Sequence, residues 1–220
     1  MVDLHSARRE YAGEPIPGDI DSPWPLFEQW FDQARQAERD GALIEPAAMT
    51  VVTVDADGQP SARVLLLKAF DAERGEHGSF DFYSHATSRK GIALEHNPRI
   101  ALLLYWPALN RQVRIEGTVT TQPAAEAEAY WHERPKASQV AAVVSHQSHP
   151  RDSRASLEAE FAAATAEYAD REVPCPPDWR GYRVSPHRFE FWQGLPGRLH
   201  DRVACTLQPD EAWFSERLDP

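Results

Sequence analysis

The stretch MTVVTVDADGQPSARVLLLKAF, residues 49–70, constrains the fold of this chain most strongly. Two apolar, β-branched runs flank Asp57-Gly58, a dipeptide typical of a tight turn, so the stretch predicts a β-hairpin. Further strand-like runs follow at 79–85, 99–106, 111–121, 181–194, 202–208 and 211–218. Helical patterns at 25–41, 88–98, 123–135 and 153–170 interrupt them. Antiparallel strands in succession with helices between them predict an α+β protein, built as a β-barrel or sheet with appended helices.

The chain has 220 residues, 42% of them hydrophobic, which suits one large domain. Residues 1–24, rich in Pro, Gly and charge, predict an irregular arm, and residues 25–220 predict a single domain. The formal net charge of −11 disfavours a general nucleic-acid surface and binding to anionic membranes. No run approaches the roughly 18 apolar residues of a membrane span, and no signal peptide is evident. Cys175 and Cys205 do not form a disulfide framework, so we expect a cytoplasmic protein.

Several common catalytic signatures are absent from the sequence. It contains no GxGxxG, GxxxxGK[ST], GxSxG or HExxH motif, so neither a dinucleotide or P-loop site nor a hydrolase site is indicated. His146 and His149 have metal-ligand spacing, but no Cys or carboxylate joins them locally. We therefore expect no metal site.

Cationic residues gather in four clusters despite the acidic composition. Alternation along a strand puts Arg63 and Lys68 on opposite faces, so one ligand can use both only near an edge or a bulge. The run Ser88–Lys90 opens a predicted helix, where free N–H groups suit an anion. The other two clusters lie in YWHERPKASQ, residues 130–139, and EFWQGLPGRLHDR, residues 190–202. Together they predict binding of a phosphorylated small molecule, with an aromatic ring stacked beside it.

At these same clusters the sequence resembles the pyridoxamine (pyridoxine) 5′-phosphate oxidase family. The resemblance runs from RREY at residues 8–11 to the terminal ERLDP. It rests on RVLLLK, FYSHATSRK, RQV, YWHERPKASQ, SHQS, GYRVSPHRFEFWQG and RLHDR, in the order and spacing of the family. It implies an FMN-binding split β-barrel with surrounding helices. It also implies a homodimer with FMN at the subunit interface, a C-terminal dimerisation segment at 175–220, and an N-terminal lid.

The resemblance also implies a function and a set of site residues. The function is oxidation of pyridoxamine or pyridoxine 5′-phosphate to pyridoxal 5′-phosphate, by hydride transfer from C4′ to flavin N5, with oxygen reduced to hydrogen peroxide. FMN would be bound by Arg63, Val64, Leu65, Lys68, Tyr83, Ser84, Arg89, Lys90, Gln112, Gln147, Ser148, Trp192 and Arg202. The substrate would be bound by Arg8, Tyr11, Lys68, Tyr130, Arg134, Ser138, Arg198 and His200, with Arg198 and His200 as the catalytic pair.

Two other functions stay open at this point. One is an FMN oxidase of the same fold that acts on another ring, such as a phenazine precursor. A substrate without a phosphate would have no use for Lys68, Tyr130, Arg134 and Ser138, all of which are present. The other is a binding protein for flavin or pyridoxal phosphate that catalyses nothing.

Overall fold

The computed structural model describes residues 10–220. The helices are α1 Pro23–Arg39, α2 Arg89–His96, α3 Ala124–Glu133, α4 Lys136–Val144 and α5 Arg154–Glu167, with 3₁₀ turns at Pro107–Leu109 and Pro196–Arg198. The strands are β1 Ala48–Val54, β2 Pro60–Leu66, β3 Ala69–Asp71, β4 Ser79–His85, β5 Arg99–Trp106, β6 Arg111–Thr121, β7 Trp179–Gln193, β8 Asp201–Leu207 and β9 Trp213–Arg217. Within the described residues, no helix combines the length and the apolar character that a membrane crossing needs.

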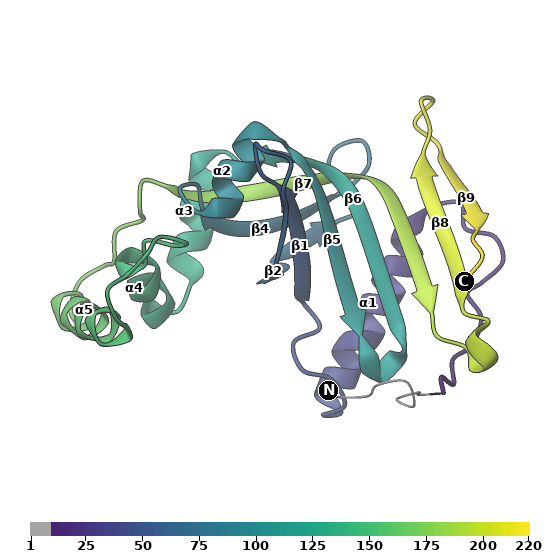
Figure 1. Cartoon of the computed structure of the whole chain (residues 1–220), viewed down its shortest axis with the longest axis horizontal. Coiled ribbons are helices and arrows are strands. Elements are labelled where there is room, and N and C mark those ends of the chain that lie inside the picture. Colours follow the sequence, from purple (N-terminus) through teal and green to yellow (C-terminus); the bar gives the residue numbers. More distant parts are fainter. Residues whose placement is uncertain (1–9) are drawn as a thin grey trace.

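All described strands belong to one antiparallel sheet in the order β2-β1-β5-β6-β7-β4-β3, with β8 paired to β7 and β9 paired to β8. β7 is the strand at which the sheet divides. On one side it pairs with β6 along most of its length, and on the other its first half pairs with β4 and its second half with β8. The β6–β7 register shifts at Gly117, where a Cβ atom would lie 2.5 Å from the carbonyl oxygen of Ser185, so only glycine allows this close approach. The sheet curls strongly around this point (Figure 1).

α1 fills the concave side of the sheet. Ser22 caps the helix, with its side chain accepting from the Trp24 amide, and Pro23 takes the first helical position, which needs no donor. Phe27 is fully buried, and its ring lies 5.0 Å from that of Phe70 and 5.1 Å from that of Phe80. This aromatic core fixes the helix to the sheet. A smaller core cluster joins α3, α4 and α5 to the start of β7.

The structure confirms the predicted hairpin and the other predicted strands, and it adds two elements. β3 pairs with β4 over only three residues, too few to show a sequence pattern. α4 follows α3 directly, because Pro135 ends one helix and starts the next. The arm from residue 10 onward packs closely, with Ile16 and Ile20 buried in the main core. Figure 1 shows α4 and α5 at one end of the molecule and the β8–β9 hairpin at the other.

Candidate functional site

The predicted site residues fall into two groups at opposite ends of β7. Tyr83 is the register partner of Gly181 near the start of the strand, whereas Trp192 pairs with both Gln112 and Arg202 near its end. Eleven residue steps separate Gly181 from Trp192, about 36 Å along the strand at roughly 3.3 Å per residue. We call the first group the phosphate half-site: Arg63, Lys68, Tyr83, Ser84, Arg89, Lys90, Tyr130, Arg134, Ser138, Gln147 and Ser148. We call the second group the ring half-site: Tyr11, Gln112, Trp192, Arg198, His200 and Arg202.

Lys90 is a buried ammonium group that has no carboxylate partner among residues 10–220. Ser88 caps α2 and places Lys90 in the first turn, pointing inward. Its Nζ donates to Ser84 Oγ at 2.9 Å, Ser88 Oγ at 3.1 Å and Gln147 Oε1 at 2.6 Å, all neutral acceptors. Burial, with a smaller contribution from the charge of Arg63, lowers the pKa of Lys90 to about 8. A buried cation with neutral partners is an energetic liability that a bound anion relieves.

The Arg63 guanidinium is also held by neutral groups. It lies on β2, an edge strand, and donates to Val51 O, Thr53 Oγ1 and Ser61 Oγ at 2.7–3.1 Å. These contacts orient the guanidinium without cancelling its charge. The two positions that follow it on the strand differ: the Val64 side chain is exposed and that of Leu65 is partly buried against the core.

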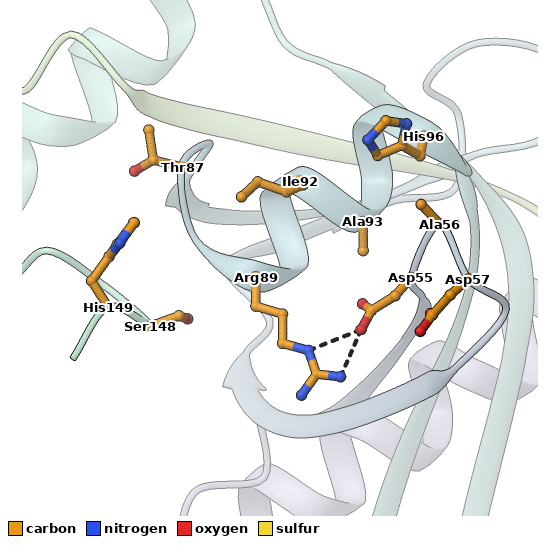
Figure 2. A pocket seen from close by; sticks show the side chains of 10 residues that line it. All are labelled: Asp55, Ala56, Asp57, Thr87, Arg89, Ile92, Ala93, His96, Ser148 and His149. Atoms are coloured by element: carbon orange, nitrogen blue, oxygen red, sulfur yellow. Dashed lines mark hydrogen bonds and ion pairs between the residues drawn. The ribbon is translucent and has the colours of Figure 1, made fainter.

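Arg89 has a carboxylate partner that the sequence did not indicate. Its Nε and Nη2 donate to Asp55 Oδ2 at 3.0 and 2.6 Å (Figure 2). Asp55 lies at the start of the β1–β2 turn, and its sequence context signals only the hairpin. A pocket of about 500 Å³ lies beside this pair, and Ser148 and His149 line its other side (Figure 2).

Lys68 and Arg134 form a second cationic pair, and neither has an ion-pair partner in the part of the chain that the structure describes. Burial, and then the positive charge of Arg134, lower the pKa of Lys68. The Arg134 Nη1 atom is buried and has no hydrogen-bond partner among the described residues. Tyr83 links Tyr130 to the Lys90 cluster. Its ring stacks on that of Tyr130 with centroids 3.8 Å apart, and the next residue, Ser84, accepts a hydrogen bond from Lys90. Ser138 lies in the first turn of α4, close in sequence to Arg134.

The ring half-site gathers three aromatic side chains. The Tyr11 ring meets Trp192 edge-on at 5.6 Å and His200 at 5.3 Å, and the last two rings lie 4.8 Å apart. His200 Nδ1 accepts from the Leu195 amide at 3.2 Å, which leaves the neutral ring's proton on Nε2. Arg198 is exposed with a φ of 61°, a conformation that a non-glycine residue adopts at an energetic cost. The predicted substrate residue Arg8 lies outside the described residues.

Arg202 is fixed by a buried carboxylate, Glu190. Arg202 Nη2 and Nε donate to Glu190 Oε1 at 2.8 and 3.2 Å, and Arg114 Nη1 donates to Oε2 at 3.1 Å. Arg202 Nη1 also donates to the carbonyl oxygen of Asp219 at 2.6 Å. Glu190 and Trp192 lie two positions apart on β7, so the sequence indicates that their side chains share one face of the strand. Sequence alone does not place the Glu190 carboxylate beside an arginine on the next strand.

Comparison with known proteins gives a consistent result along the whole chain. A family profile described as "Pyridoxamine 5'-phosphate oxidase" matches residues 36–168, and one described as "Pyridoxine 5'-phosphate oxidase C-terminal dimerisation region" matches residues 179–220. A Bacteroides fragilis protein named pyridoxine/pyridoxamine 5′-phosphate oxidase is 45% identical over 100% of this chain and 90% of its own length. A Bordetella petrii protein of the same name is 50% identical over 90% of each chain.

Solved structures support the same fold. PhzG from Burkholderia lata, crystallised with tetrahydrophenazine-1-carboxylic acid, superposes with a TM-score of 0.82 and 30% identity, over 91% of this chain and 94% of that one. A pyridoxamine 5′-phosphate oxidase-related, FMN-binding protein from Nostoc punctiforme superposes with a TM-score of 0.70 and 17% identity, over 90% and 98%. The predicted split-barrel fold is thereby confirmed.

Replacing Lys90 by methionine should stabilise the apoprotein at pH 7, by on the order of 1–3 kcal/mol. The gain should shrink as the pH rises from about 8 to about 10.5. In that range folded Lys90 has lost its proton while the unfolded chain still binds one, so the stability of the wild type rises relative to that of the variant. Urea denaturation at fixed protein concentration across this pH range measures both effects. A Lys90→Met protein that is less stable at pH 7, or a difference that does not change with pH, would contradict the assignment of Lys90 as an uncompensated buried cation.

Proposed function

The chain belongs to the pyridoxamine 5′-phosphate oxidase family, an enzyme family whose cofactor is FMN, and from that premise we propose that it oxidises pyridoxamine or pyridoxine 5′-phosphate to pyridoxal 5′-phosphate. The alcohol and oxygen give the aldehyde and hydrogen peroxide. The amine reacts in the same way, and water then releases ammonia.

The observation that carries this proposal is the buried ammonium of Lys90 with only neutral partners. A phosphate monoester carries about −1.5 to −2 charge near pH 7 and accepts several charge-assisted hydrogen bonds. Lys90 and Arg63 supply two positive charges, and neither forms an ion pair with a carboxylate within the described residues, although the charge of Asp55, the ion-pair partner of Arg89, also acts on Arg63. This donor set fits the phosphate of FMN, so we assign that group to it, with Arg89 at its edge.

The separation of the half-sites supports a homodimer as the active form. A single chain holds Lys90 and Trp192 at opposite ends of β7, too far apart to contact one cofactor. In a dimer with twofold symmetry, the phosphate half-site of one protomer can face the ring half-site of its partner, which gives two equivalent sites. The segment matched by the dimerisation profile includes β7, β8 and β9, the strands that carry or support the ring half-site.

The second cationic pair, Lys68 and Arg134, is assigned to the phosphate of the substrate. The unpartnered Nη1 of Arg134 and the mutual repulsion of the two cations are both relieved by an anion. Burial raises the pKa of Tyr130, so its phenol stays neutral and can donate to a phosphate oxygen. Ser138 would add a hydroxyl donor from α4.

When bound, FMN supplies the hydride acceptor, and the chain supplies placement and charge. Trp192 and the neutral imidazole of His200 offer apolar and polar contacts for a pyridine ring. Arg198, exposed on its strained turn, would offer a fixed positive charge to that ring. Holding substrate C4′ against the cofactor removes much of the entropic barrier to hydride transfer. Tyr11 packs on Trp192 and His200, so the arm helps to exclude water.

The structural likeness to PhzG keeps a phenazine-type substrate as the second candidate. The second cationic pair favours the phosphorylated substrate, because a phosphate monoester brings about −1.5 to −2 charge and three acceptor oxygens, whereas the carboxylate of a phenazine acid brings only a single charge. The 45–50% identity to proteins named pyridoxine/pyridoxamine 5′-phosphate oxidase supports the same choice.

The purified protein should be yellow, and anaerobic mixing with pyridoxamine 5′-phosphate should bleach its flavin absorbance. Admission of oxygen should restore the absorbance and release hydrogen peroxide. Stopped-flow absorbance and a peroxide assay measure the two steps. A flavin band that persists with both phosphorylated vitamers would indicate a binding protein. If only a reduced phenazine acid bleached the flavin, the result would support the second candidate, a phenazine-type substrate.

Replacing Arg134 by alanine should raise the KM for pyridoxamine 5′-phosphate by about 10- to 100-fold and leave kcat within roughly threefold. A phosphate that does not react is bound alike in the ground state and the transition state, so its clamp affects mainly KM. Steady-state peroxide release gives both constants, and the exposed Arg154→Ala on α5 serves as the control. An unchanged KM together with a collapsed kcat would remove Arg134 from the phosphate clamp.

A further inference from the structure

Two tryptophan rings, and no carboxylate, hold the guanidinium group of Arg134. Its Cζ lies 4.4 Å from the ring centroid of Trp179 and 5.2 Å from that of Trp131. Within residues 10–220, Arg134 forms no ion pair, and its Nη1 has no hydrogen-bond partner. Arg134 also precedes Pro135 at the break between α3 and α4, so its backbone is extended there.

This mode of support differs from that of Arg183 and Arg202, two other partly buried arginines. Arg183 pairs with Asp81 and Glu126, and Arg202 pairs with Glu190. A carboxylate partner would orient Arg134 but would also neutralise it and compete with an incoming phosphate. A cation–π contact orients the guanidinium through its face and leaves both its charge and its edge N–H groups available.

Trp179 is the ring that connects this support to the rest of the site. It is 7% exposed and begins β7, where it pairs in register with His85. Its ring is nearly parallel to that of Tyr83, at 5° and 6.2 Å, and Tyr83 in turn stacks on Tyr130. One indole therefore contacts the guanidinium of the clamp and supports its tyrosine.

We propose that Trp179 is a positioning residue that keeps Arg134 oriented and fully charged for the substrate's phosphate, and that it thereby sets the selectivity for phosphorylated over non-phosphorylated substrates. The inference rests on the proposed function. It deepens that function by naming a residue that is absent from the predicted site.

The test uses FMN-loaded Trp179→Leu with pyridoxamine 5′-phosphate and with pyridoxamine as substrates. KM for the phosphorylated substrate should rise about 3- to 30-fold, the range expected for loss of a cation–π contact. The kcat and the FMN content should stay near wild-type values, and kcat/KM for pyridoxamine should not change. Trp24→Leu on α1, a tryptophan of similar burial with no cation over its ring in the described part of the chain, is the matched control and should change neither substrate's constants in protein that retains FMN.

A double-mutant cycle with Arg134→Ala separates positioning from general structural support. On that background Trp179→Leu should cause no further rise in KM. The proposal would be overturned if the two substitutions raised KM multiplicatively, or if Trp179→Leu lowered kcat/KM equally for both substrates. If Trp179→Leu does not retain FMN, Trp179→Phe takes its place. Because Phe is the weaker cation–π partner, KM for pyridoxamine 5′-phosphate should then rise about two- to fivefold. An unchanged KM would overturn the proposal. Failure of the wild-type protein to oxidise pyridoxamine 5′-phosphate would instead refute the proposed function.

Discussion

The length of β7 is the constraint on which the site depends. One strand, Trp179–Gln193, carries Trp192 of the ring half-site near its end and pairs near its start with β4, which carries Tyr83 and Ser84 of the phosphate half-site. A β-strand cannot fold back on itself to bring its ends together. The same strand holds the sheet together, because it pairs with β6 on one side and with β4 and then β8 on the other. The fold therefore builds two rigid, separate surfaces on one chain, and a second copy is the simplest way to join them.

The charges of the phosphate half-site are arranged for a ligand more than for stability. Lys90 and Arg63 donate to hydroxyl, amide and carbonyl oxygens, and Arg134 is stacked on indoles. Each arrangement orients a cation and leaves its charge uncompensated, which lowers the stability of the empty protein and strengthens anion binding. Where the chain needs a fixed arginine instead, as at Arg202, it uses the buried carboxylate of Glu190.

Local patterns predicted most of the fold, and contacts between distant segments account for what they missed. The Asp57-Gly58 hairpin and the Ser88 helix cap are local signals, and both are present. α4 was missed because Pro135 suggested only a helix end, although proline is equally suited to precede a first turn. The motif residues of the site were predicted through the family resemblance. Their partners Asp55, Glu190 and Trp179 were not, because the pairing of a carboxylate or an indole with a given cation is set by strand register and tertiary packing.

Active-site complementation tests most directly whether opposite ends of β7 from two chains form one site. Lys90→Met and Arg198→Ala should each be nearly inactive as homodimers. Unfolded together in equal amounts and refolded, they should recover about a quarter of wild-type activity, because half of the dimers are mixed and each mixed dimer has one site free of both substitutions. Mixed dimers that form but remain as inactive as either parent would show that each site is built within a single chain, and would contradict this account.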